Sequence, residues 1–265
     1  MIKHFILIRF YCLDMLPKDI IFNEAFLRTQ FNIFKQYCLT SLENQTCSNF
    51  EIILIIHNDI DLDKLKFLQT LQSSLKIHIL RYKDIMNFLN NQLNNDFFIT
   101  SKIDHDDVVY KDCIKDIQNL TDYDIPLQFI GFNNGLTMIE NDFENAYLFS
   151  PRYDYNGAIS IMQTLIVNKH LIKDNLNIFQ AGPHTNTKTH FKNLYDKYNF
   201  IFDESYFKLN TFKDYAWIYI QHDANHSMLT NNMNKWHRSN IKVNKSKTWF
   251  IENFGNFFND SLSNQ

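Results

Sequence analysis

Three carboxylates follow directly on an apolar segment near the middle of the chain. Residues 97–103 are mostly apolar, and Asp104, Asp106 and Asp107 come next, with His105 between the first two. Carboxylates this close raise one another's pKa unless a cation or a hydrogen-bond donor offsets their charge. Mg²⁺ and Mn²⁺ prefer oxygen ligands, accept one or two protein carboxylates and fill their other positions with water and phosphate oxygens. The segment therefore predicts a divalent cation, Mn²⁺ or Mg²⁺, held by this cluster of carboxylates against a nucleotide diphosphate.

The same acids have a second interpretation. A helix is expected over residues 111–120. Acidic residues just before a helix interact favourably with its dipole and cap its first turn. On the residues alone, the metal site and the helix cap remain equally open.

A histidine follows a second apolar segment much later in the chain. Residues 216–221 are expected to form a strand, His222 comes immediately after them, and His226 lies a few residues further on. An imidazole nitrogen from His222 can complete the coordination of the same cation. The alternative is a surface or hydrogen-bonded histidine, which is the more common role of a single histidine at the end of a strand.

These residues need a scaffold that brings strand ends together. Four short apolar runs are bounded by polar or turn residues, as strands buried on both faces are: residues 5–10, 51–57, 76–81 and 97–103. Between them, three segments carry apolar residues at near-helical spacing: residues 23–42, 62–75 and 84–93. This alternation predicts an α/β fold with a mainly parallel central sheet flanked by helices. Ligands of such sheets bind at the carboxyl ends of the strands, where Asp104 is expected.

The second half of the chain is less regular. Residues 123–187 contain short strand-like pieces broken by Asn, Asp and Gly, and an aromatic, helical segment is expected over residues 248–258. No stretch is rich enough in Pro, Gly or Ser to form a linker, and no repeat is present. We therefore expect residues 1–265 to form a single domain.

Composition excludes several classes of protein. The net charge of −3 gives no concentrated positive face, so no nucleic acid is expected as a partner. The four cysteines show no C-x-x-C spacing, which argues against a disulfide framework or a structural zinc and favours a cytoplasmic location. Residues 1–10 are too short to span a bilayer and have no cleavage site, so they are expected to form a buried strand.

Four motifs in the same order resemble the bacterial rhamnosyltransferases, which look like GT-A glycosyltransferases with a Rossmann-like nucleotide-diphospho-sugar transferase fold. They are HFILIRFY at residues 4–11, RTQFNIF with YCLTSL and QT within residues 28–46, TSKIDHDD at residues 100–107, and WIYIQHDANHS at residues 217–227. Three positions depart from the family pattern. Tyr11, Thr40 and Lys102 stand where the family typically has Asn, Pro and Arg.

This resemblance implies a function and a division of the chain. Asp104 and Asp106 would form the D-x-D motif, and His222 would complete the metal site. The enzyme would be an inverting hexosyltransferase that moves a sugar, such as rhamnose, from dTDP-rhamnose or a UDP-sugar to an oligosaccharide or lipid-linked acceptor of a bacterial surface glycan. Residues 1–110 would bind the nucleotide-sugar, residues 111–230 would form the acceptor side, and residues 231–265 would be a C-terminal tail.

Further candidates lie around this core. Arg9 would contact the diphosphate or the base, although it could instead cap the sheet edge or pair with a nearby acid. Lys102 would contact the diphosphate, and it keeps the positive charge without the planar fork of Arg. Asp59 follows the second strand, where GT-A enzymes often place an acid against the nucleobase or ribose; solvation in a loop is the equal alternative. Asp154 and His184 are candidates for the general base that takes the acceptor's proton.

Two questions stay open on the sequence. The basic, aromatic segment at residues 235–247 has two interpretations. It suits peripheral contact with the inner face of an anionic membrane, and it also suits a segment solvated at the protein surface. The acids at a strand end also suit a metal-dependent nucleotidyltransferase or phosphohydrolase. A non-catalytic glycan-binding protein with a GT-A-like fold is the third class of function.

Overall fold

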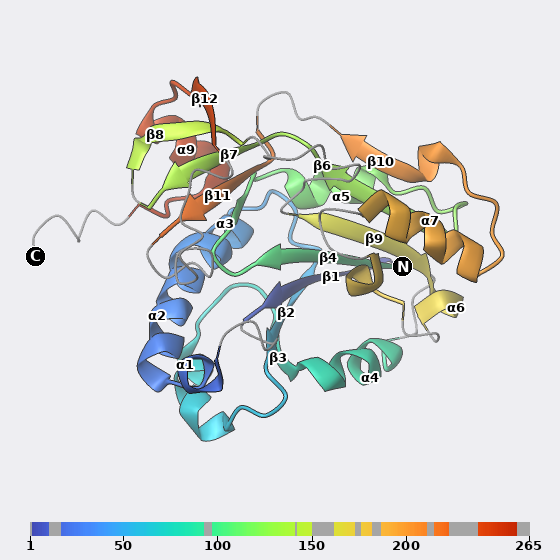
Figure 1. Ribbon diagram of the computed structural model, residues 1–265, viewed down its shortest axis with the longest axis horizontal. Coiled ribbons are helices and arrows are strands. Elements are labelled where there is room, and N and C mark those ends of the chain that lie inside the picture. The colour runs from blue at the N-terminus through green and yellow to red at the C-terminus, as the bar shows by residue number, and fades with distance from the viewer. Residues whose placement is uncertain are drawn as a thin grey trace, which may run out of the picture.

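The computed structural model describes residues 2–10, 17–92, 97–140, 142–149, 162–172, 176–181, 187–210, 215–222 and 238–258. Two sheets organise this part of the chain (Figure 1). The larger sheet contains seven strands: β1 (Ile2–Arg9), β2 (Glu51–Ile56), β3 (Ile77–Arg81), β4 (Phe97–Asp104), β6 (Leu127–Phe132), β9 (Gln163–Asn168) and β10 (Phe207–Asn210). Their order across the sheet is β10-β6-β9-β4-β1-β2-β3.

The centre of the larger sheet is parallel. β1 pairs in parallel with β2 and with β4, and β2 pairs in parallel with β3. β9 lies antiparallel between β4 and β6, and β10 continues beyond β6 in parallel. The predicted α/β fold with a mainly parallel central sheet is therefore confirmed. β9 is the strand that runs in the opposite direction to its neighbours.

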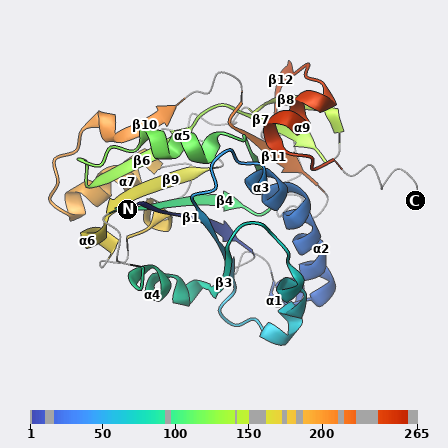
Figure 2. The ribbon, with the colours of Figure 1, turned by 180° about the vertical axis from the view of Figure 1, so that it is seen from behind.

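Helices cover both faces of this sheet, as Figures 1 and 2 show from opposite sides. They are α1 (Lys18–Ile21), α2 (Glu24–Phe34), α4 (Ile85–Asn90), α5 (Cys113–Leu120), α6 (Lys169–Ile172) and α7 (Thr187–Lys197). Because successive strand residues point to opposite faces, Ile6 and Ile8 pack with α2 and α5, whereas Phe5 and Leu7 pack with α4 and α7. No helix in the described ranges has the length and apolar character that crossing a membrane requires.

The helix predicted for residues 23–42 is one continuous helical segment. The side chain of Asn23 accepts a hydrogen bond from the backbone N–H of Phe26 at 3.1 Å and caps the start of α2. A π-helical turn, Lys35–Leu39, and then α3 (Thr40–Glu43) follow without a break. Residues 24–43 are called the α2–α3 segment below.

The helix predicted for residues 62–75 is wrong in type and extent. The structure has a 3₁₀ helix, Leu62–Thr70, which starts where the Asp61 side chain accepts a hydrogen bond from the N–H of Asp63. Apolar residues spaced three or four apart suit either helix type over so few turns, so the pattern did not distinguish them.

The smaller sheet lies beside the carboxyl ends of the central strands (Figure 1). Its strands are β5 (Val108–Val109), β7 (Gly135–Ile139), β8 (Asp142–Phe149), β11 (Trp217–Gln221) and β12 (Arg238–Lys242), in the order β12-β8-β7-β11-β5. β11 pairs in parallel with β7 and antiparallel with β5. α9 (Lys247–Phe254) packs on this sheet through Phe250 and Phe254. β5 directly follows the acids of the sequence motif, so the smaller sheet holds one side of their turn.

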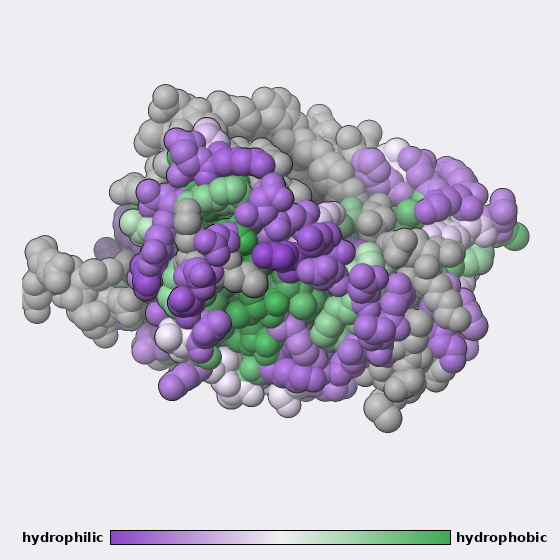
Figure 3. All heavy atoms as spheres, turned by 90° about the horizontal axis from the view of Figure 1, so that it is seen from below, coloured by the Kyte–Doolittle hydropathy of each residue, from purple (hydrophilic) through white to green (hydrophobic). Residues whose placement is uncertain are grey.

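β3 is one edge of the larger sheet, and β10 is the other. Figure 3 views the molecule from below Figure 1 and shows an apolar area bordered by polar residues on the side that faces the viewer. Ile79 of β3 is 37% exposed. The strand is short and carries His78 and Arg81 on either side of Ile79, and polar or charged residues on an edge strand discourage pairing with another chain.

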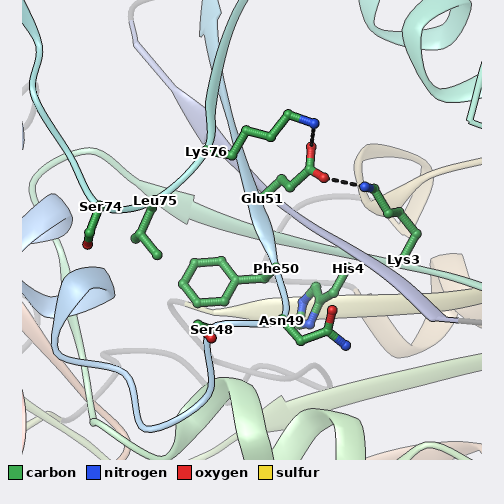
Figure 4. A pocket seen from close by; sticks show the side chains of 9 residues that line it. All are labelled: Lys3, His4, Ser48, Asn49, Phe50, Glu51, Ser74, Leu75 and Lys76. Carbon is green, nitrogen blue, oxygen red and sulfur yellow. Dashed lines mark hydrogen bonds and ion pairs between the residues drawn. The ribbon is translucent and has the colours of Figure 1, made fainter.

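A cavity of about 400 Å³ lies at the amino ends of the central strands, opposite the ends beside the smaller sheet (Figure 4). Glu51 is its main acid, and it interacts with Lys3, with the Lys76 Nζ at 3.1 Å and with the His78 Nε2 at 2.6 Å. Burial alone raises the pKa of Glu51, but the hydrogen bonds from these three groups outweigh it and lower the pKa to about 2. The charged groups of this cavity therefore satisfy one another, and they form a cluster that joins β1, β2 and β3.

A tryptophan packs at the junction of the two sheets. Trp217 is fully buried, donates a hydrogen bond from its Nε1 to the carbonyl oxygen of Phe132 at 3.0 Å, and meets the ring of Phe149 edge-on. Gly135 lies directly opposite in the β7–β11 register. A Cβ atom at residue 135 would be 2.1 Å from the indole ring, so only glycine fits there.

Replacing Gly135 with alanine should unfold the protein at lower denaturant concentrations. The added carbon must displace a fully buried indole, and such overpacking costs about 1–3 kcal/mol or more. The measurement is urea-induced unfolding of both chains. Gly131→Ala is the matched control, because a Cβ there would be 3.1 Å from the Phe129 ring and needs only a small shift. An equal or smaller loss for Gly135→Ala than for Gly131→Ala would contradict this packing.

Glu51→Gln should lower the melting temperature at neutral pH and lose its effect in acid. A carboxylate whose folded pKa is lowered stabilises the fold above its ordinary pKa of 4.5, and that contribution is lost as the pH falls toward about 2. The measurement is the melting temperature of parent and variant between pH 7 and pH 2. Glu24→Gln removes an exposed ion pair with Arg28 and is the control, with a small difference at every pH. A parent–variant difference that grows toward pH 2 would show the assignment to be wrong.

Candidate active site

The three acids form a turn between β4 and β5, at the carboxyl end of a central strand. Asp104 is the last residue of β4, and the N–H of Asp107 donates to the carbonyl oxygen of Asp104 at 3.3 Å. α5 begins only at Cys113, after Asp112 as its N-cap residue. The acids therefore do not cap that helix. They lie at the edge of the sheet where ligands of α/β proteins bind.

Asp104 is held by an arginine from the neighbouring strand. Arg9 and Asp104 are direct partners in the β1–β4 register, and the Nε and Nη2 of Arg9 donate to the Asp104 Oδ1 at 3.0 and 2.7 Å. Both side chains are partly exposed. The sequence left open whether Arg9 contacts a ligand or pairs with an acid, and in this structure it pairs with Asp104 while remaining accessible.

Lys102 brings a second positive charge to this point. It lies two residues before Asp104 in β4, so the two side chains lie on the same face of the sheet. It is 6% exposed. Burial, reinforced by the charge of Arg9 and opposed by Asp104, lowers the pKa of Lys102 to about 8. Arg9 and Lys102 together make the carboxyl end of β1 and β4 suited to an anion.

Asp106 meets a histidine that lies 116 residues away in the sequence. The Nε2 of His222 is 3.2 Å from the Asp106 Oδ2, and both side chains are buried. His222 directly follows β11, and β11 pairs with β5 just after the acidic turn, so the smaller sheet brings the two side chains together. Burial alone raises the pKa of Asp106, but interactions with His105 and His222 outweigh it and lower the pKa to about 2.

Asp107 behaves in the opposite way. It is buried, and burial together with the charges of Asp106 and Asp104 raises its pKa well above the ordinary value. Its Oδ1 has no hydrogen-bond partner among the residues that the structure describes. A buried carboxylate oxygen without a donor is costly, and a nearby cation would reduce that cost.

The donor set fits a divalent cation that keeps open positions. Asp106 and His222 supply one carboxylate oxygen and one imidazole nitrogen, and Mn²⁺ accepts both. In the described part of the chain, no three His, Cys, Asp or Glu side chains converge into a complete protein site. A site with two protein donors leaves room for phosphate oxygens and water, which is usual for ions that act on nucleotides. The set of Asp104, Asp106 and His222 expected from the resemblance stays a prediction.

The remaining predicted residues differ in position. Asp59 follows β2, is largely exposed, and pairs with the Nζ of Lys18 at 3.0 Å. It therefore lies at the same edge of the sheet as the acidic turn, on a loop far from that turn in the sequence. Asp154 and His184 lie outside the described residues, so their role as a general base stays a prediction.

Sequence reasoning missed two residues beside the acidic turn. The Nε2 of His105 is 2.8 Å from the Oε1 of Gln30 in α2, and both side chains are buried. One signal for this contact is present in the sequence. Gln30 lies on the apolar stripe of α2 with Leu27 and Phe31, where a polar side chain needs a buried partner.

Comparison with known proteins identifies a family. A family model described as "Putative rhamnosyl transferase" matches residues 17–231. No curated protein matches the chain.

Solved structures give distant matches. The inositol-1-phosphate CTP transferase from T. maritima is 11% identical, with a TM-score of 0.41 over 86% of this chain and 94% of that chain. HddC from Yersinia pseudotuberculosis is 17% identical, with a TM-score of 0.38 over 81% and 92%. A protein from Bacillus anthracis described as a "Putative Glucose-1-Phosphate Thymidylyltransferase", in complex with a sucrose, is 14% identical, with a TM-score of 0.34 over 87% and 93%.

Asparagine at residues 106 and 107 should change stability in opposite directions when no metal is present. Asp107→Asn removes a buried acid whose ionised form its surroundings disfavour, and should raise the melting temperature by about 2–4 °C, which corresponds to roughly 1 kcal/mol for a chain of this size. Asp106→Asn removes a charge that its surroundings stabilise, and should lower it. The measurement is thermal unfolding in EDTA. A lower melting temperature for Asp107→Asn than for the parent would contradict the repulsion among these acids.

Proposed function

The chain belongs to the rhamnosyl transferase family of the matching model, and on that premise we propose that it is a metal-dependent glycosyltransferase. It transfers a sugar, with rhamnose as the expected one, from a nucleotide-diphosphate donor to a bacterial surface glycan. dTDP-rhamnose or a UDP-sugar is the donor, and an oligosaccharide or lipid-linked glycan is the acceptor. Mn²⁺ or Mg²⁺ is the cofactor.

The contact between Asp106 and His222 carries this proposal. Two buried side chains 116 residues apart in sequence approach to 3.2 Å at the carboxyl edge of the sheet. A structural role explains the contact less well, because it leaves Asp107 buried beside Asp106 with a raised pKa and an unpaired oxygen. A cation held by Asp106 and His222 would offset the charge of all three acids.

Each group in the site has a distinct task in the proposed reaction. The cation, when bound, supplies Lewis-acid stabilisation of the charge that grows on the departing diphosphate. Asp106 and His222 would hold it, with Asp104 beside them. Arg9 and Lys102 would bind diphosphate oxygens: Arg9 as a fork already oriented by Asp104, and Lys102 as a point charge. Because Lys102 is buried, its interaction with an anion is weakly screened.

The acceptor side is assigned from the sequence alone. Asp154 and His184 are the proposed general bases, and one of them would take the proton of the acceptor hydroxyl as it attacks the anomeric carbon. An α-linked product from a β-linked rhamnose donor requires inversion at that carbon.

A lipid-linked acceptor would place the enzyme at the inner face of the cytoplasmic membrane. In the described part of the tail, the Nζ of Lys245 lies 4.6 Å from the Trp249 ring centroid, and Ile241 is 59% exposed. Lys242 is exposed next to Ile241. Cationic residues beside an exposed apolar one support contact with anionic lipid through this segment.

Nucleoside diphosphates should stabilise the parent chain only in the presence of Mn²⁺, and should not stabilise Asp106→Ala. A ligand that binds only the folded state raises its stability by about 2.7 kcal/mol at a hundredfold excess over its dissociation constant. The measurement is the thermal shift of both chains with dTDP and UDP, with and without Mn²⁺. Asp63→Ala, which removes an acid at the protein surface, is the control and should keep the full shift. A Mn²⁺-dependent shift that persists in Asp106→Ala would show that the metal does not bind at Asp106.

Product analysis distinguishes this reaction from its nearest rival. Glycosyl transfer releases an intact nucleoside diphosphate from the donor. Release of a nucleoside monophosphate or of pyrophosphate would instead identify a phosphohydrolase or a nucleotidyltransferase.

A further inference from the structure

Gln30 is a buried polar residue on the apolar side of the α2–α3 segment. It has no exposed surface, and its neighbours on the same helical stripe are Leu27, Phe31 and Phe34. A buried amide without a hydrogen bond costs roughly 1–3 kcal/mol, so such a residue is stable here only with a partner. Its Oε1 accepts a hydrogen bond from the Nε2 of His105 at 2.8 Å.

His105 is the residue between the two acids of the predicted metal motif. It is 7% exposed, and its ring meets Phe10 edge-on with centroids 5.7 Å apart. Its two neighbours have other partners: Asp104 contacts Arg9, and Asp106 contacts His222. The hydrogen bond to Gln30 therefore anchors this side chain of the turn to a helix.

The same helical segment is also linked, through Glu140, to the residue that precedes His222. The hydroxyl of Tyr37, in the π-helical turn, donates to the Glu140 Oε1 at 3.1 Å. The N–H of Glu140 donates to the carbonyl oxygen of Gln221 at 2.9 Å, one residue before His222. The Ser41 Oγ accepts from the N–H of Val109 at 3.2 Å, just after the acidic turn. One helical segment thus bonds directly to the chain just after the acidic turn and, through Glu140, to the residue before His222.

We propose that Gln30 is a positioning residue for the metal site. By holding His105, it fixes the orientation of the turn so that the Asp106 carboxylate faces the His222 imidazole. Gln30 itself does not touch metal or substrate. This inference rests on the proposed function, because it takes Asp106 and His222 as the metal donors.

The test is the affinity for Mn²⁺ alone. The protein, without any nucleotide-sugar, is titrated with Mn²⁺, and the free Mn²⁺ is detected. Gln30→Met keeps the length and shape of the side chain but cannot accept the hydrogen bond. Loss of a residue that orients a metal ligand typically weakens metal affinity by about 10–100-fold, and a loss in this range is expected here. The titration is made well below the melting temperature of every variant, so that all are folded.

Gln128→Met is the matched control. Gln128 is also fully buried and hydrogen-bonded, to the backbone of Asp122 and Ile125, but it lies in β6 away from the acidic turn. This variant should lose stability in EDTA to a similar extent while keeping the Mn²⁺ affinity of the parent. A purely structural role for Gln30 would give the two variants the same result.

A double-mutant cycle tests whether Gln30 acts through His105. His105→Phe keeps an aromatic ring against Phe10 and removes the ring nitrogens. If the hydrogen bond is the cause, the double variant should bind Mn²⁺ no more weakly than the weaker of the two single variants. Losses that multiply would show that Gln30 acts by another route.

The outcomes for this inference and for the proposed function differ. A parent chain that binds no Mn²⁺ would overturn the metal site, and the positioning role with it. A parent that binds Mn²⁺ and a Gln30→Met variant that binds it equally well would overturn the positioning role alone.

Discussion

The pairing of β5 with β11 is the contact on which the site depends. It joins only Val108 and Val109 to Ile218 and Trp217, yet it fixes the end of the acidic turn to the strand that directly precedes His222. Trp217 secures the pair by filling the junction of the two sheets and by donating to the carbonyl oxygen of Phe132 in the larger one. Without this short ladder, the turn that carries Asp106 would be attached only to the larger sheet, whereas His222 follows a strand of the smaller one.

The site combines acids whose surroundings differ sharply over four residues. Asp104 faces an accessible arginine, Asp106 a buried histidine, and Asp107 an environment that disfavours its charge. This asymmetry arises because the turn leaves the larger sheet at Asp104 and enters the smaller one at Val108. Adjacent side chains therefore point into different layers of the molecule. A cluster of like charges can persist where each member has a different neighbourhood, and where a ligand completes the balance.

The central strands were predictable because local pattern determines them. β1, β2 and β4 are buried on both faces, so they appear in the sequence as mainly apolar runs, and Asp104 could be placed at a strand end from its position alone. The smaller sheet was not predictable in this way. β5 has two residues, and β8 is only partly buried along its length, so neither gives a clear apolar period. The contacts of Asp106 with His222 and of His105 with Gln30 depend on pairing between distant segments, which local periodicity does not encode. Asp59 shows the same limit, because its exposure and its pairing with Lys18 follow from how α1 lies beside the loop after β2.

The long separation between Asp106 and His222 also constrains how the protein is made. Chains are synthesised from the amino end, and contacts between distant residues carry a larger entropic cost of loop closure than local ones. Most of the central strands, with Arg9 and Asp104 among their residues, can form while the ribosome is still translating the second half. β11 becomes available only afterwards, and the two candidate metal donors meet only then. A nascent or truncated chain that ends before residue 217 would therefore present its acids without His222, so that the contact between Asp106 and His222 would arise late, as a mark of completed folding.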